Sequence, residues 1–565
     1  METESLAPKS PWWISHARWI GPAIFLVAFL FRLVGIGWGL PSPDRAFSYH
    51  PDETINWIYS NQIDLAKGDL DPNFYNYGTL YLTLLSVSTK VTDAYSPAVE
   101  SDNPMAGFLR IGSYLMAGRW ISAFAGALLV ALVWVAGRRF LGVPACAAAT
   151  LSAFFAPGLL MHSRFATVDV LATALVFGAL TYLVFVATAT EEEQPLVLRW
   201  LILAGVLIGL SAGTKYSGFL ALPSLFWVAW QFLPAQKRGQ GLALCGAVPV
   251  VAFLLSTPGV LHNFEAFKRD FSYELAHTAT GHGLVFSGTP SGFIVHFGNL
   301  ISAYGAILTL LTPLCLFLLW RKDLKVGIPL VVYFVLMYVA IGRAEVKFVR
   351  YVFPLIPVLA LGIGAMYEAF SSQKPSLRSV GHVLIFLGIG GFGGGGAADS
   401  VSWTTMMTRP DPRDRVAEIL KDAESIGVVS DPWFYTPPFY PQVGAPRSVP
   451  ADQRNQWMLA ETRPRVIRAT DAAGTPVDFG TVFGEELPQY IVYSSFESED
   501  RERIIEAPRS RLTDGEFAQG ANYAAFKKWL LERYQLDHLT GATGPGPHDL
   551  MYIQPRVWVW KRKPI

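Results

Sequence analysis

Residues 168–189, VDVLATALVFGALTYLVFVATA, decide the fold class of this chain. The stretch contains one charged residue, Asp169, which lies at its second position. A helix needs about 20 mostly apolar residues to cross the hydrocarbon core of a bilayer, and about 17–25 is the usual range. The stretch is therefore predicted to be a transmembrane helix with a carboxylate at one end.

Similar apolar runs recur throughout the first two thirds of the chain. They lie at residues 19–40, 77–96, 117–137, 143–160, 199–214, 216–235, 241–258, 293–320, 326–342, 350–370 and 379–397. Over all 565 residues, 52% are hydrophobic and 16% are charged, whereas a soluble domain has about 25% charged residues. These features predict a polytopic α-helical membrane protein. The net charge of +1 argues against a nucleic-acid partner, which would require a basic face.

The distribution of basic residues predicts the orientation in the membrane. Cytoplasmic loops are enriched in Lys and Arg. If 77–96, which contains Gly78 and Lys90, lies on the membrane surface and every other run crosses, the basic segments share one side. These segments are the N-terminus and residues 138–139, 237–238, 321–325 and 374–378. We therefore expect 11 spans, surface-lying helices and a cytoplasmic N-terminus.

The chain is predicted to divide into two parts near residue 399. Residues 1–398 form the membrane module, with a first outer loop at 40–116, and 399–565 form an extracytoplasmic α/β domain. Strands are expected at 426–430, 490–493 and 557–561, and a helix at 521–534. Residues 432–441, rich in Pro, Tyr and Trp, could frame an acceptor groove or simply be a surface loop.

Polar side chains gather at the predicted outer face. The sequence His50-Pro51-Asp52-Glu53 follows the first apolar run, and carboxylates at the mouth of a span are costly unless they have a role. The orientation was derived without these residues, so their clustering on one side independently supports an outer active site. The others at this face are Arg119, His162, Arg164, Asp169, Lys215, His277, His282, Arg343, Lys347 and Arg350.

The order and spacing of these motifs resemble a known superfamily, the GT-C membrane glycosyltransferases. The resemblance extends from about residue 31 to 397, and is strongest to the branch with protein O-mannosyltransferases and aminoarabinose transferases. One departure is Tyr75-Asn76-Tyr77, where some lipid-modifying members have a Glu-Lys pair, so aminoarabinose transfer is disfavoured. The motifs are His50-Pro-Asp-Glu-Thr54, Arg119, Gly137-Arg-Arg-Phe140, His162-Ser-Arg164 with Asp169, Gly213-Thr-Lys-Tyr216, Gly281-His282, and Arg350-Tyr351 followed by Pro354 and Pro357.

The resemblance implies an inverting enzyme that moves a sugar from a polyprenyl-phosphate carrier to an extracytoplasmic lipid, glycan or protein. A lipid phosphate is a good leaving group, so the reaction needs a base for the acceptor and cations for the phosphate. Asp52 is the expected general base, and Glu53 is expected to orient Asp52 or the acceptor. In the alternatives, Asp52 caps a helix that starts at Glu53, and Glu53 is a solvated first-turn carboxylate.

Several cations are candidates for the donor phosphate. Arg119 could bind it bidentately or extend to the membrane interface. Lys215 has the same two alternatives. Arg343, Lys347 and Arg350 form a cationic patch between two runs, which could bind phosphate or face lipid headgroups.

The remaining candidates have less specific roles. Asp169 could lie near the acceptor or a metal ion, or could pair with Arg164 at the interface. Arg164 and His282 are expected to contact substrate. His277 and His282 could ligate a divalent metal ion, although their spacing matches no compact site. No cofactor is assigned.

Two other functions remain open from the sequence. A lipid or solute transporter or flippase would usually show internal repeats and charges buried in mid-span, and the sequence shows no clear repeat. An oligosaccharide ligase or oligosaccharyltransferase would use a pyrophosphate-linked glycan, and the Trp-Trp-Asp signature of oligosaccharyltransferases is absent from the chain. The expected location is a bacterial-type plasma membrane, with the site facing the cell envelope.

The predicted topology can be tested by cysteine labelling. Cysteines placed near Lys237 and Ser371 should react only from the cytoplasm, and those near Gly283 and Asp500 only from outside, because the basic loops are retained inside. Labelling of position 500 from the cytoplasm alone would overturn the 11-span arrangement.

Overall fold

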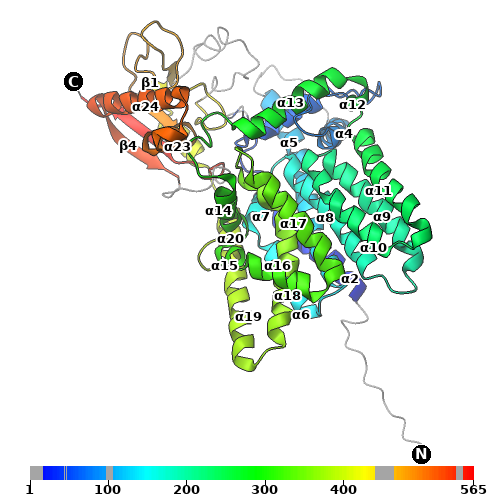
Figure 1. The fold of residues 1–565 in the computed structure, drawn as a ribbon. Helices are drawn as coiled ribbons and strands as arrows, with labels where there is room; N and C mark the ends of the chain where they lie inside the picture. Colours follow the sequence, from blue (N-terminus) through cyan, green and yellow to red (C-terminus); the bar gives the residue numbers. More distant parts are fainter. Residues whose placement is uncertain are drawn as a thin grey trace, which may run out of the picture.

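The computed structural model describes residues 17–42, 45, 47–96, 106–439, 464–541 and 551–564. Most of these residues form a helical body, and a smaller part with all the described strands follows it in the chain. Figure 1 shows this smaller part at one end of the body, the end that also holds α4 (Leu80–Tyr95) and α13 (Phe264–Thr280). The turn between α18 (Ile356–Ser371) and α19 (Pro375–Gly390) lies at the opposite end.

The helical body contains the long apolar helices that the sequence predicts. Six segments are long and apolar enough to cross a membrane, and the expected multi-span helical architecture is confirmed. Three shorter apolar helices are at Trp19–Leu33, Val143–Phe154 and Pro375–Gly390. The total of 11 spans stays a prediction. The six segments are Leu109–Gly137, Val168–Ala187, Gln194–Ala212, Ala235–Ser256, Leu324–Gly342 and Val349–Ser371.

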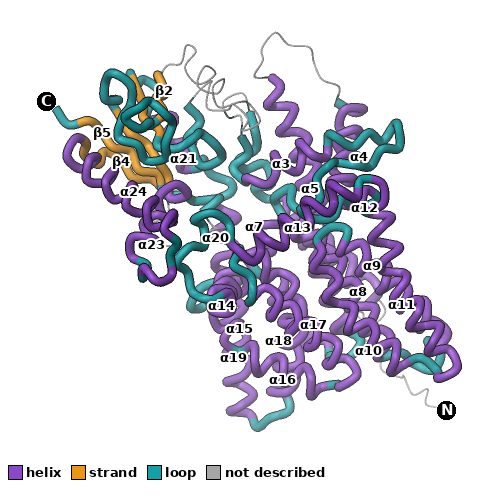
Figure 2. Tube along the Cα trace, turned by 45° about the horizontal axis from the view of Figure 1, so that its top comes forward, coloured by secondary structure: helices purple, strands orange, loops and turns teal. Residues whose placement is uncertain are grey.

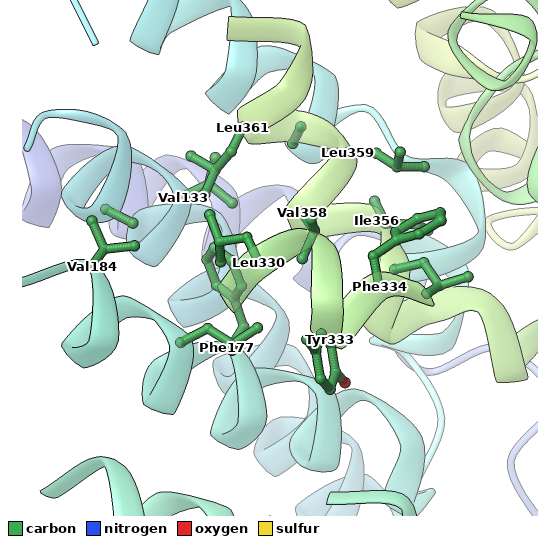
Figure 3. Close-up of a cluster of buried hydrophobic side chains, with 14 of the residues drawn as sticks. Val133, Phe177, Val184, Leu330, Tyr333, Phe334, Ile356, Val358, Leu359 and Leu361 are labelled. Carbon is green, nitrogen blue, oxygen red and sulfur yellow. The ribbon is translucent and has the colours of Figure 1, made fainter. Parts of the chain in front are cut away.

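Helix α8 (Val168–Ala187) lies at the centre of the body. Of its most apolar window, 78% is buried, compared with 33% for α11 (Ala235–Ser256). A helix that is hydrophobic on all sides belongs in a core. Figure 3 shows α8 side chains such as Phe177 and Val184 in the same cluster as Leu330 of α17 (Leu324–Gly342) and Leu361 of α18.

Two predicted spans are shorter or more broken than expected. The run 293–320 forms three helices. Gly305, with φ 137°, ends α14, and Pro313 lies in the first turn of α16. In the run 379–397 the helix ends at Gly390. In the turn that follows, Gly395 lies so close to Gly305 that a Cβ atom on residue 395 would be 2.3 Å from the Cα of Gly305. Only glycine permits this approach. The bounds are α14 Gly292–Tyr304, α15 Ala306–Leu310 and α16 Thr312–Lys322.

The other helices complete the body. They are α2 Ala17–Leu33, α3 Pro51–Ser60, α5 Ala106–Gly137, α6 Val143–Phe154, α7 Pro157–His162, α9 Val197–Ala212, α10 Leu222–Phe232, α12 Gly259–His262 and α20 Gly396–Met406, with 3₁₀ segments η1 Gln194–Leu196, η2 Tyr216–Ala221 and η3 Val349–Leu355. The predicted domain boundary at residue 399 falls within α20.

The C-terminal part is built on a five-stranded mixed sheet of order β2-β1-β3-β5-β4. The three predicted strands and the predicted helix are confirmed as β1, β3, β5 and α24, and Figure 2 shows the strands grouped beyond the helical body. Strands β2 and β4 were not predicted, and Tyr534, expected to end the helix, begins β4. The bounds are β1 Ser425–Val428, β2 Arg465–Arg468, β3 Tyr490–Ser494, β4 Tyr534–Thr540, β5 Val557–Arg562, α21 Pro412–Ile419, α23 Ser495–Glu506, η4 Arg509–Arg511 and α24 Asp514–Arg533.

The sheet combines two kinds of pairing. Strand β1 runs parallel to β2 and β3, whereas β5 runs antiparallel to β3 and β4. Helices α23 and α24 pack against each other beside this sheet. The last two residues of the aromatic segment 432–441, Tyr440 and Pro441, lie outside the described residues.

Candidate functional site

The first outer loop presents two neighbouring carboxylates through helix α3. The helix begins at Pro51, and its N-cap is His50, whose Nδ1 accepts a hydrogen bond from the backbone N–H of Asp52 at 3.3 Å. The alternative that Asp52 caps a helix starting at Glu53 is therefore wrong. Consecutive helical residues point about 100° apart. The Asp52 side chain is 35% exposed and that of Glu53 is 0% exposed.

Glu53 and Arg119 form a buried bidentate ion pair. The Nε and Nη2 groups of Arg119 donate to the two carboxylate oxygens of Glu53, each at 2.7 Å. Its Nη1 donates to the carbonyls of Ile36 and Trp38, and the Ala166 N–H donates to Glu53 at 2.6 Å. The alternatives that Glu53 is a solvated carboxylate and that Arg119 extends to the membrane interface are therefore wrong. Although burial raises the pKa of Glu53, Arg119 outweighs it and holds that pKa below its usual value.

Asp52 belongs to a second, more open set of charges. Arg350 lies between two carboxylates, with Nη2 at 3.3 Å from Asp52 and Nε at 3.8 Å from Asp169. The other oxygen of Asp169 accepts a hydrogen bond from Lys215 at 2.6 Å. The structure thus brings together four of the predicted site residues from α3, α8, the α9–η2 turn and η3.

Aromatic rings hold both cations of this set in place. The guanidinium of Arg350 lies over the ring of Phe348 at 3.9 Å, and the ammonium of Lys215 lies over the ring of Tyr351 at 4.4 Å. Cations over ring faces are stabilised by the ring quadrupole. Both cations are therefore held in place by aromatic rings as well as by carboxylates.

Three of these charged residues, Asp169, Lys215 and Arg350, line a cavity of about 370 Å³, and Asp52 lies beside it through its contact with Arg350. Asn76 and Glu274 add further polar groups to the lining. The rest of the wall is mainly apolar, from Val176 of α8, Phe219 and Leu220 of η2, and Met337, Ala340 and Ile341 of α17. The cavity can accept a molecule with an anionic head and a hydrocarbon body.

Five predicted substrate-binding residues do not line this cavity. Arg119 is paired with Glu53, and His282 contacts His277. Arg164 is buried and donates to the carbonyls of Leu160 and Phe31 and to the hydroxyl of Thr404. Lys347 is buried and pairs with Glu345 at 2.8 Å, and Arg343 is exposed at the end of α17. The predicted cationic patch is therefore separated, with only Arg350 at the cavity.

The histidines of the outer loop contact each other. The Nε2 of His277 and the Nδ1 of His282 are 2.7 Å apart, and Glu274 is 3.6 Å from the other nitrogen of His277. The His282 ring packs against Phe348, whose face holds Arg350. Within the described residues, no three His, Cys, Asp or Glu side chains form a group suited to a metal ion.

Two residues near the site had no predicted role. Burial lowers the pKa of His50 to about 3, so its imidazole is neutral and can cap α3. Tyr552, from the C-terminal part, lies 3.5 Å from Arg350 and packs against His50. The position of His50 in the quoted motif was a usable signal, whereas nothing in the sequence around Tyr552 indicated this contact.

Replacing Glu53 with Gln should destabilise the protein, because buried Arg119 would keep its charge without a carboxylate. Loss of one partner from a buried ion pair typically costs about 3–5 kcal/mol. Thermal unfolding of the detergent-purified protein measures this loss. Since the pKa of Glu53 is lowered, its stabilising contribution is present at neutral pH and is lost as the pH falls through that pKa. The difference between the two proteins should therefore shrink in acid.

The matched control is Glu193→Gln. Glu193 also forms a bidentate pair, with Arg139 at 2.9 and 2.6 Å, but its side chain is 27% exposed. Solvent screening should make its effect much smaller. Equal unfolding temperatures for wild type and Glu53→Gln at neutral pH would contradict a structural role for the buried pair.

Comparison with solved structures returns several membrane enzymes. ArnT from Cupriavidus metallidurans bound to undecaprenyl phosphate is 17% identical, with a TM-score of 0.47, over 72% of this chain and 70% of that one. The Archaeoglobus fulgidus oligosaccharyltransferase in complex with Zn and sulfate is 12% identical, with a TM-score of 0.46, over 92% and 72%. The S. cerevisiae protein O-mannosyltransferase Pmt1-Pmt2 complex bound to the sugar donor is 14% identical, with a TM-score of 0.32, over 44% and 34%.

Comparison by sequence gives a match to one family model. No curated protein matches the chain. The sequence model of the family described as dolichyl-phosphate-mannose-protein mannosyltransferase matches residues 94–259, which include α5 to α11 and thus Arg119, Asp169 and Lys215. Residues 94–259 therefore carry a GT-C glycosyltransferase domain of this family, within a multi-pass membrane protein.

Proposed function

We propose that this protein is an inverting glycosyltransferase that moves a sugar from a polyprenyl-phosphate donor to an extracytoplasmic lipid, glycan or protein. The observation that carries the proposal is the arrangement around Arg350. This cation pairs with the partly exposed Asp52 on one side and lines the mainly apolar cavity on the other. An acceptor-activating carboxylate and a phosphate-binding cation therefore meet at a lipid-sized cavity.

The cavity suits the donor in charge and in polarity. A polyprenyl phosphodiester has one negative charge, which Lys215 and Arg350 can share, because guanidinium and ammonium groups both bind phosphate oxygens. The apolar wall formed by η2 and α17 fits the first isoprene units. The matched family is described by a dolichyl-phosphate-linked donor, which belongs to the same chemical class.

The proposed reaction is a direct displacement at the anomeric carbon. The acceptor oxygen forms a bond to that carbon as the bond to the phosphate oxygen breaks, and the polyprenyl phosphate leaves with the electron pair. Asp52 accepts the acceptor's proton, while Lys215 and Arg350 stabilise the charge that develops on the phosphate. Attack opposite the leaving group inverts the configuration.

Glu53 and Arg119 have a positioning role in this proposal. The ion pair fixes α3 to α5, so that Asp52 lies beside Arg350, which lines the cavity. Asp169 holds Lys215 and approaches Arg350, which keeps both cations at the cavity. His282 could touch the acceptor through its position beside Phe348.

The arrangement of the elements also bears on the finer topology. The outer-loop helices α4 and α13 and the C-terminal part lie at one end of the helical body, opposite the α18–α19 turn (Figures 1 and 2). This arrangement supports 11 spans, a membrane module at 1–398 and an extracytoplasmic domain at 399–565. The proposed location is a bacterial-type plasma membrane.

Asp52→Asn should abolish most transfer without loss of donor binding. The substitution keeps the shape of the side chain but removes the base, and loss of a general base typically costs about 10²–10⁴-fold in rate. Reconstituted protein can be assayed with tritium-labelled polyprenyl-phosphate-mannose as probe donor and membranes of the source cells as acceptor. Near-wild-type transfer by this variant would reject the assignment of Asp52.

The matched control is Asp64→Asn. Asp64 follows α3 in the same outer loop and has a side chain that is 40% exposed, close to the value for Asp52, but it pairs with Lys67 away from the cavity. This variant should transfer at the wild-type rate. Transport of lipid by the native protein, with no glycosyl product from a panel of polyprenyl-phosphate sugars, would reject the enzyme class.

Arg350→Ala should weaken donor binding. A hydrogen bond to a charged group contributes about 1.5–3 kcal/mol, which corresponds to about 10- to 150-fold in affinity. Equilibrium binding of the labelled donor to purified protein measures this change. Arg343→Ala is the control, because Arg343 is exposed and does not line the cavity. Equal weakening by both variants would favour a general headgroup attraction instead of a phosphate site.

A further inference from the structure

We infer that Tyr552, from the C-terminal part of the chain, is a positioning residue of the active site. Its hydroxyl oxygen accepts a hydrogen bond from Nη1 of Arg350 at 3.5 Å. Its ring packs against the imidazole of His50, with ring centroids 4.6 Å apart. Tyr552 therefore contacts both the cation that pairs with Asp52 and the residue that caps the helix carrying Asp52. The inference rests on the proposed function, because it assigns Arg350 to the donor phosphate.

The backbone and the ring of Tyr552 are fixed by its own domain. Its carbonyl accepts a hydrogen bond from Arg413 at 2.5 Å, and its ring stacks on Phe496 with centroids 5.4 Å apart and planes within 9°. The Tyr552 side chain is almost fully buried. Because its backbone and its ring are both held, the Tyr552 side chain has a defined position and can restrict the position of Arg350.

Arg413 and the neighbouring Asp414 also hold the first outer loop. The guanidinium of Arg413 is fully buried, pairs with Asp411 at 2.7 Å and lies over the ring of Tyr49 at 3.6 Å. The hydroxyl of Tyr49 donates to Asp414 at 2.5 Å, and Arg45 pairs with the same carboxylate at 2.8 Å. The loop that leads into α3 is thus bound to the segment that holds Tyr552.

The contact with Arg350 has a functional consequence. Arg350 lies 3.3 Å from Asp52 and 3.8 Å from Asp169, farther than the 2.6 Å between Lys215 and Asp169, so these two carboxylates hold it less tightly than Asp169 holds Lys215. An arginine loses much rotamer entropy when it binds a ligand, and a group that orients it beforehand reduces that cost. The Tyr552 hydroxyl and the Phe348 ring supply this orientation from two sides.

Tyr552→Phe tests the inference, because it removes only the hydroxyl and keeps the ring on His50. We expect the KM for polyprenyl-phosphate-mannose to rise about three- to tenfold, the effect of losing one typical net hydrogen bond, because Arg350 keeps its ion pairs. The value of kcat should stay within about twofold, because Asp52 is unchanged. A merely structural role would reduce the amount of active enzyme, and so lower kcat without changing KM.

The matched control is Tyr534→Phe. Tyr534 is another buried tyrosine of the same domain, and its hydroxyl donates to the carbonyl of Pro488 at 2.9 Å, within the sheet region. Its loss should leave the KM unchanged. Combination of Tyr552→Phe with Arg350→Ala provides the second readout. If Tyr552 acts through Arg350, the double variant should bind the donor no more weakly than Arg350→Ala alone.

The outcomes separate this inference from the function on which it rests. A wild-type protein without transfer activity, in the assay used for Asp52→Asn, would overturn the proposed function and the inference together. An active wild type with an unchanged KM for Tyr552→Phe would overturn the inference alone. Additive losses of donor affinity in the double variant would do the same, because they would show that Tyr552 acts independently of Arg350.

Discussion

The structure of the site depends on the buried ion pair between Glu53 and Arg119. Two charges without solvent exposure are costly unless their hydrogen bonds are satisfied. Here Arg119 donates to both oxygens of Glu53 and to the carbonyls of Ile36 and Trp38, and Glu53 also accepts from Ala166. The pair therefore joins the end of α2, the start of α3 and the entry to α8. Because Glu53 must point inward, its helical neighbour Asp52 must point elsewhere, and its carboxylate lies 3.3 Å from Arg350.

Ion-pair distances distinguish structural charges from charges that can change partners. The Glu53–Arg119 contacts are 2.7 Å and fully buried, so a substrate could replace neither partner. Arg350 lies 3.3 and 3.8 Å from its two carboxylates, and the Asp52 side chain is 35% exposed. A donor phosphate can therefore take over part of the coordination of Arg350. Its arrival would leave Asp52 more available to the acceptor, so that donor binding and base activation become coupled through one guanidinium.

The sequence predicted the helical body well, because span length and apolar composition are local properties. It also predicted that the polar residues gather at one end, since positive-inside bias acts through loop composition. It could not show which way each side chain points. Arg119, Arg343, Lys347 and Arg350 were equivalent as cations near outer ends of spans, yet only Arg350 reaches the cavity. Strand β4 was missed because YQLDHLT is an exposed edge strand with little hydrophobic pattern, and the glycine-rich run at 391–396 was assigned to a span because its composition is apolar.

The contact between Tyr552 and the site was beyond sequence-based prediction, because it depends on how two separately folded regions pack. The partners are far apart in the chain, with 202 positions between Arg350 and Tyr552. In the folded chain, Arg413 and Asp414 of α21 join the segment of Tyr552 to the first outer loop. The C-terminal part of the chain thus contributes a side chain that contacts Arg350 and His50. Any movement of the C-terminal part relative to α3 would separate the Tyr552 ring from His50 and its hydroxyl from Arg350, so the position of that part and the orientation of Arg350 are coupled.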